Sequence, residues 1–107
     1  NSNMTMKRPS KIPNVLEVIR KSITNGNFYD VSHAEGRKEE RNITRPEYLY
    51  VLKHGYHEPK KDEYKEEFKA WNYSIRGKTV DGRELRVVVS FDDNFMLIIT
   101  VINLEKS

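Results

Sequence analysis

The chain contains no cysteine, which excludes disulfide bonds and metal sites built on thiolates. It also has no apolar run close to the roughly 20 residues that a membrane-spanning helix needs. The longest apolar stretch, residues 95–102, is interrupted by Thr100 and is typical of a buried strand. No basic segment followed by an apolar one marks the start of the chain, so we expect no secretory signal. These absences lead us to expect a cytoplasmic protein that does not bind membranes.

Several functional motifs are missing as well. The sequence has no glycine-rich phosphate loop, no nucleophile elbow and no zinc-binding pattern. His54 and His57 lie three residues apart and near Glu58, but Gly55 is expected to end a helix between them, so they would not share one face. We therefore expect neither a metal site nor a cofactor.

The length and charge of the chain set further limits. With 107 residues, the chain is long enough for one domain with its own core and too short for two ordinary domains. We expect a flexible polar tail over residues 1–12 and a single domain over residues 13–107. The net charge is +3, from 19 Lys and Arg against 16 Asp and Glu, which permits RNA or an acidic protein as partner without requiring either.

The first half of the chain has the apolar spacing of helices. An apolar stripe predicts a helix that opens at Pro13 and stops at residues 25–27, where Gly26 suits a left-handed cap. Residues 28–31 are a candidate for a short strand.

Two capping boxes, each a Ser or Thr followed three residues later by Glu, predict two further helices. The first begins after Ser32 and covers about residues 33–41. The second begins after Thr44, has Glu47 as its capping carboxylate, and ends at Gly55.

The second half of the chain has the period of two that is typical of strands. A charged connection over residues 58–69 is followed by candidate strands over residues 71–76, 85–91 and 95–102, with a strong hairpin signal at Asp81-Gly82. Helices first and strands later predict an α+β domain, with the helices on one face of a three- to four-stranded antiparallel sheet and the other face partly open.

The most distinctive local pattern lies in the second predicted helix. His33, Arg37 and Arg41 follow each other at steps of four residues, which keeps them on one helix face. A titratable base beside two permanent cations is a plausible way to hold a phosphate and move a proton near it.

This pattern resembles the His-Ala-x-x-Arg-x-x-x-Arg-x-Ile-Ser/Thr signature of a small bacterial domain family of unknown function. The matching residues are His33, Ala34, Arg37, Arg41, Ile43 and Thr44. Later segments also resemble that family, at residues 51–55, 73–77, 81–89 and 98–102. Gly36 departs from the pattern, because a helix former is expected there.

The family is similar to RelE-like and BrnT-like toxins, and the additional helix near the start is similar to the architecture of the MqsR-type interferase. The resemblance implies the RelE/barnase-like fold of helices packed on an antiparallel sheet. It implies activity only loosely, because a fold does not fix a function.

The leading interpretation is a toxin-like, metal-independent endoribonuclease, the toxin of a bacterial toxin–antitoxin pair. Such a reaction needs a base for the 2′-hydroxyl proton, cations for the charge on phosphorus and an acid for the leaving oxygen. The candidate catalytic residues are His33, Arg37, Arg41 and Arg76, and the candidate RNA-binding residues are Ser74, Lys78 and Arg86. The expected partners are RNA, with mRNA on the ribosome among the targets, and an antitoxin protein.

Structural roles compete with each assignment. His33 can be a structural hydrogen-bonding residue, and the arginines of the motif can pair with nearby glutamates. Arg76 and Arg86 can form cross-strand pairs with Glu84 or with surface carboxylates, and Trp71 is expected to lie in the core.

Two other functions stay open at the level of sequence. One is a non-catalytic RNA- or protein-binding module of the same fold. The other is an interaction protein with no role in nucleic-acid chemistry, which would be marked by an open sheet face that is apolar rather than basic.

Overall fold

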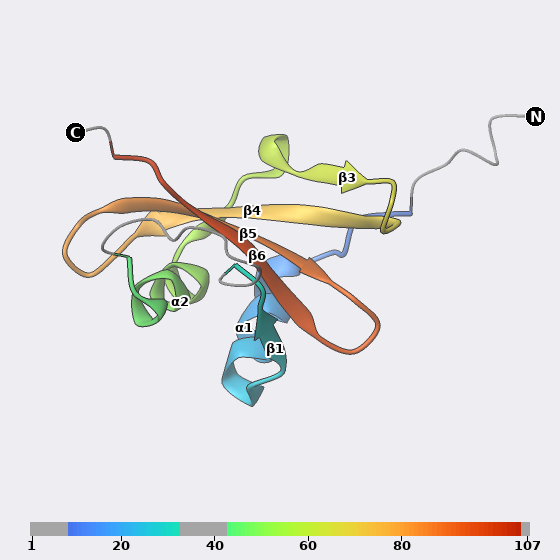
Figure 1. Ribbon diagram of the computed structural model, residues 1–107, viewed down its shortest axis with the longest axis horizontal. Coiled ribbons are helices and arrows are strands. Elements are labelled where there is room, and N and C mark those ends of the chain that lie inside the picture. Colours follow the sequence, from blue (N-terminus) through green and yellow to red (C-terminus); the bar gives the residue numbers. More distant parts are fainter. Residues whose placement is uncertain (1–8, 33–42, 106–107) are drawn as a thin grey trace, which may run out of the picture.

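The computed structural model describes residues 9–32 and 43–105. In this part of the chain, two α-helices, α1 and α2, lie on one side of a six-stranded sheet, in which the short strand β3 pairs with β4 (Figure 1). The elements are α1 (Val15–Asn25), β1 (Phe28–Asp30), α2 (Arg45–His54), β2 (Tyr56–His57), the 3-10 turn η2 (Pro59–Lys61), β3 (Glu63–Lys65), β4 (Ala70–Lys78), β5 (Glu84–Phe91) and β6 (Met96–Asn103).

The sheet is mixed rather than purely antiparallel. Its strand order is β1-β6-β5-β4-β2, and β3 also pairs with β4. Strands β4, β5 and β6 form an antiparallel meander, whereas β1 runs parallel to β6, with Phe28 opposite Met96. The α+β class is therefore confirmed.

The predicted sheet of three to four antiparallel strands is wrong in strand number and in one direction. The charged connection supplies β2 and β3, which have two and three residues and are too short to show a period of two. The parallel direction of β1 comes from its pairing with β6, a strand far away in the sequence, so no local pattern predicts it.

The helix α1 forms as its apolar stripe predicts. Val15 and Ile19 are buried against the sheet. Gly26 ends the helix in the left-handed conformation with φ 71°, and its N–H donates to the carbonyl oxygen of Ile23. The predicted strand after this helix is also confirmed as β1.

The helix α2 begins at the predicted capping box. The Thr44 N–H donates to Glu47 Oε1 at 2.7 Å, and Glu47 Oε2 also accepts a hydrogen bond from Arg83 Nη2 at 2.6 Å. The hydrogen bond from the Thr44 backbone, with a smaller contribution from Arg83, holds the pKa of the Glu47 carboxyl below its ordinary value. One carboxylate therefore caps α2 and ties it to the β4–β5 hairpin.

The core lies between the two helices and the meander. Its fully buried members are apolar side chains from both layers: Ile19, Val51, Leu52, Ile75, Leu85, Val87, Val89, Met96 and Ile98. Trp71, which was expected in the core, is half-buried and packs against its margin.

A bulge in β6 explains why this strand is apolar on both faces. Val88 pairs with Thr100 and Val89 pairs with Ile98, so Ile99 is an extra residue on β6. A bulge shifts the alternation of side chains, and both Ile99 and Ile102 consequently lie on the sheet face away from the helices.

The predicted helix over residues 33–41 lies outside the described residues, and so do His33, Arg37 and Arg41. Their described neighbours are Ser32, just after β1, and Ile43, which is buried next to the start of α2. Within residues 9–32 and 43–105, no helix is long and apolar enough to cross a membrane.

Candidate functional site

The sheet face opposite the helices, called here the open face, carries two of the predicted arginines side by side. Arg76 of β4 and Arg86 of β5 are directly opposite each other in the strand register. The same row continues to Tyr56 of β2, which is 53% exposed, and to Ile102 of β6. An exposed aromatic ring therefore lies next to two guanidinium groups.

Two glutamates bind these arginines and complete what we call the four-charge cluster: Glu58, Arg76, Glu84 and Arg86. Arg86 Nε donates to Glu58 Oε1 at 2.9 Å, and Arg76 Nη1 approaches Glu58 Oε2 at 3.4 Å. Arg76 Nε donates to Glu84 Oε2 at 2.7 Å. Glu58 thus lies between the two arginines, and the cross-strand pairing expected as the structural alternative is present.

The cluster keeps its carboxylate at the centre ionised. Burial raises the pKa of the Glu58 carboxyl, but the hydrogen bonds and charges of Arg86 and Arg76 outweigh burial and hold this pKa below its ordinary value. The Glu58 side chain is only 16% exposed, so solvent screens these interactions less than it would on an open surface.

The placement of Glu58 depends on the turn after α2. Gly55 ends the helix, and β2 then pairs with β4, with Tyr56 opposite Arg76. The Glu58 N–H donates to the carbonyl oxygen of Ser74 at 2.8 Å, which fixes the backbone of Glu58 over the sheet. The sequence analysis missed Glu58 because it is 18 residues from Arg76 and 28 from Arg86 in the chain. The nearest feature that the sequence indicated was Gly55, as the end of the helix that precedes Glu58.

The other two predicted RNA-binding residues differ in accessibility. Lys78 is exposed and lies directly opposite Glu84, a member of the four-charge cluster, in the strand register. Ser74 is only 3% exposed, its hydroxyl donates to the Lys61 carbonyl oxygen at 3.2 Å, and η2 covers it. We therefore leave Ser74 out of the candidate site.

A second polar cluster lies at the edge of the sheet near β2. The Asp62 carboxylate, whose side chain is fully buried, lies 2.8 Å from His57 Nε2 and 3.0 Å from Lys11 Nζ, and it accepts the Ser74 N–H at 3.0 Å. Trp71 Nε1 also donates to the Pro9 carbonyl oxygen at 2.8 Å, so residues 9–12 of the predicted tail are held against β4. Asp62 therefore anchors Lys11 and His57 to strand β4.

No group of three metal-ligating side chains occurs among the residues that the structure describes. His57, one of the two histidines considered as ligands, instead faces Asp62. The four-charge cluster is therefore the group of described residues best suited to act on a substrate, because it combines an ionised carboxylate with two fixed guanidinium groups.

Comparisons with known proteins give one family. No curated protein and no solved structure matches the chain. The family described as "Domain of unknown function (DUF4258)" matches residues 31–103, a range that includes α2, all strands from β2 to β6 and the whole four-charge cluster. The chain therefore belongs to the DUF4258 family of domains of unknown function.

Proposed function

We propose that this protein is a toxin-like, metal-independent endoribonuclease and that it forms the toxin of a bacterial toxin–antitoxin pair. The observation that carries the proposal is the pairing of Arg76 and Arg86 on the open face with the Glu58 carboxylate between them. Guanidinium groups bind phosphate oxygens through paired hydrogen bonds, and a carboxylate can accept a proton. RNA is the substrate class that can use both groups, because it offers a phosphate to the guanidinium groups and a 2′-hydroxyl proton to the carboxylate.

The proposed reaction is an attack of the ribose 2′-oxygen on the adjacent phosphorus. Glu58 takes the 2′-hydroxyl proton, Arg76 and Arg86 stabilise the extra negative charge on phosphorus, and the bond from phosphorus to the 5′-oxygen breaks. The leaving 5′-oxygen takes a proton from His33, which this proposal assigns as the acid. The products are a 2′,3′-cyclic phosphate and a 5′-hydroxyl.

Binding of the phosphate would prepare the base. Arg86 and Arg76 now lower the pKa of Glu58 by hydrogen bonding to it. When a phosphate takes over these hydrogen bonds, Glu58 loses them and becomes a stronger base. Arg37 and Arg41 of the sequence motif would add positive charge for binding the RNA phosphates. The exposed ring of Tyr56 would stack on a nucleobase of the RNA.

The RelE/barnase-like fold is part of the same proposal. Helices on one face of a sheet with a β4–β6 antiparallel meander are compatible with it, and the resemblance of the sequence motif to RelE-like and BrnT-like toxins supports it. An antitoxin protein is the expected physiological partner.

Glu58→Gln is the decisive variant. It keeps the shape of the side chain but removes the negative charge, so the arginines gain freedom to bind phosphate while the base is lost. We expect the wild-type protein to fragment total RNA with chelator present, directly or with translating ribosomes added. Glu58→Gln should bind single-stranded RNA more tightly and no longer cleave it, whereas Glu17→Gln, an exposed change on α1, should behave as wild type.

The second candidate function is a non-catalytic RNA-binding module. It is favoured over catalysis by the ion pairs of the four-charge cluster, because a Glu58 that serves to hold the two arginines in place need not take a proton. In that case RNA binding depends on salt and is strengthened by Glu58→Gln, but neither protein yields fragments, with or without ribosomes. Absence of RNA binding by both proteins would refute both candidates.

A further inference from the structure

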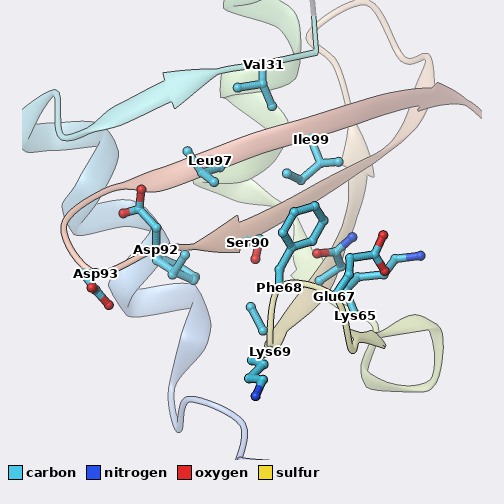
Figure 2. A pocket seen from close by; sticks show the side chains of 13 residues that line it. Val31, Lys65, Glu67, Phe68, Lys69, Ser90, Asp92, Asp93, Leu97 and Ile99 are labelled. Carbon is cyan, nitrogen blue, oxygen red and sulfur yellow. The ribbon is translucent and has the colours of Figure 1, made fainter.

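An apolar pocket of about 600 Å³ lies on the open face near the β5–β6 turn, away from the four-charge cluster. Figure 2 shows the Phe68 ring, carried by the turn between β3 and β4, pointing toward Leu97 and Ile99 of β6, with Val31 nearby. Phe68 is 74% exposed and Val31 is 36% exposed. A pocket of this size and lining is typical of a binding site.

Local structure keeps this apolar surface open instead of closing it. Lys69 adopts φ 52°, a conformation that is uncommon for a residue other than glycine, and its N–H donates to the Glu66 carbonyl oxygen at 3.2 Å. This turn holds Phe68 away from the core. On the opposite wall, the bulge in β6 supplies Ile99 as an additional apolar side chain.

The charges around the pocket indicate what it binds. Asp92 and Asp93 lie at one end, and Lys65 and Glu67 lie at the other (Figure 2). Lys69 also lines the pocket, on the turn that carries Phe68, and Lys65 is engaged by Glu63 at 3.2 Å. The acidic part of the rim is therefore the end formed by Asp92 and Asp93. This acidic end of the rim repels the phosphates of RNA and complements a basic group.

We propose that this pocket binds a segment of a partner protein that inserts a large apolar side chain between Phe68 and β6 and places a Lys or Arg against Asp92 and Asp93. The pocket is separate from the four-charge cluster. The row formed by Ser74, Val88 and Thr100 lies between them, and η2 covers Ser74 within that row. The proposal therefore does not depend on whether the protein cleaves RNA.

The test is a selection of peptides from a random display library on the full-length protein. We expect the enriched peptides to combine an aromatic or branched aliphatic residue with Lys or Arg. Phe68→Ser should weaken their binding by about tenfold or more, as expected for a central apolar contact. The matched control is Val80→Ser, because Val80 is 81% exposed but lies in the β4–β5 hairpin, outside the pocket. This control should leave peptide affinity unchanged.

A second pair of variants tests the acidic rim. Asp93→Lys should weaken peptide binding, whereas Glu17→Lys, which makes the same charge change on α1, should not. Asp92 is unsuitable for substitution because its Oδ1 accepts the N–H groups of Asn94 and Phe95 in the β5–β6 turn. Thermal unfolding of each variant shows whether the fold is retained.

Three results would overturn the proposal. The first is a library that yields no binders or only binders that Phe68→Ser does not affect. The second is an RNA oligonucleotide, rather than peptides, whose binding depends on Phe68, which would make the pocket a subsite for a nucleobase. The third is self-association that Phe68→Ser abolishes, which would make a second copy of the chain the occupant.

Discussion

At the scale of single residues, Glu58 links stability to the proposed chemistry. Its carboxylate accepts hydrogen bonds from two arginines that belong to neighbouring strands, so it joins β4 and β5 to the segment after α2. The carboxylate is thus a structural contact, and in the proposed reaction it is also the proton acceptor once a phosphate has taken over these hydrogen bonds. The two roles separate when stability and activity are measured on the same variant.

The pH dependence of stability measures the structural role of Glu58. The pKa of Glu58 in the folded protein lies below its ordinary value of 4.5, so its contribution to stability is complete above that pH and is lost as the pH falls through the folded-state pKa. We expect Glu58→Gln to be less stable than wild type near neutral pH. This difference in the free energy of unfolding should shrink as the pH falls below 4.5.

Urea unfolding at a series of pH values measures this difference. Glu17→Gln, on the exposed surface of α1, is the matched control. A difference between wild type and Glu58→Gln that stays constant with pH would show that the arginines do not stabilise the ionised form of Glu58.

At the scale of elements, the close approach of α2 to β4 depends on two glycines. A Cβ at Gly55 would meet the Arg76 carbonyl oxygen and would lie 2.7 Å from the Val51 carbonyl oxygen, and a Cβ at Gly77 would lie 2.9 Å from Gly55 Cα. The backbone at Gly55 has φ −84°, which any residue adopts, so the requirement for glycine there is one of space. This contact sets where β2 begins and hence where Glu58 lies.

Gly55→Ala is therefore expected to destabilise the protein by about 2–3 kcal/mol, because backbone atoms must move to admit the methyl group. Gly26→Ala provides the contrast: its Cβ meets nothing within 4 Å, and only the positive φ of 71° opposes alanine, at about 1 kcal/mol. Denaturant unfolding of both variants compares the two costs. Equal costs would mean that the junction of α2 and β4 relaxes freely around the extra methyl group.

The elements also show what the sequence could and could not predict. The apolar stripe of α1, the capping box of α2 and the alternation of β4 are local signals, and each predicted its element correctly. The parallel pairing of β1 and the strands β2 and β3 depend on contacts with distant parts of the chain, which leave no local pattern.

The same limit applies to the candidate site. Alternation placed Arg76 and Arg86 on one face correctly, and Glu84 was recognised as a possible partner. Alternation also placed Ser74 on that face, but it could not show that η2 would cover this residue or that Glu58 would reach the arginines. Burial of a polar face depends on the path of a connection, and the charged residues of this connection resemble ordinary solvated surface.

At the scale of the whole molecule, the open face has two ends of different character. The end near the β4–β5 hairpin carries the four-charge cluster, and the end near the β5–β6 turn carries the apolar pocket with its acidic rim. The sequence analysis treated a basic and an apolar open face as alternatives, whereas the structure shows a charge-balanced end and an apolar end on the same face. Because the two ends share no side chain, the proposed RNA substrate and the proposed partner segment would not compete for the same residues.

The cooperativity of the molecule can be tested through α1, which lies outside residues 31–103, the range matched by the family. Ile19 is fully buried in the common core, so Ile19→Ala should cost about 3 kcal/mol, whereas Ile102→Ala, at a side chain 37% exposed on β6, should cost less than about 1 kcal/mol. Because α1 shares its core with the sheet, we expect a single unfolding transition. Far-ultraviolet circular dichroism and Trp71 fluorescence should therefore give the same midpoint. In Ile19→Ala both midpoints should fall by the same amount. A helical signal that is lost before the Trp71 signal changes would instead make α1 an addition that folds separately on the domain.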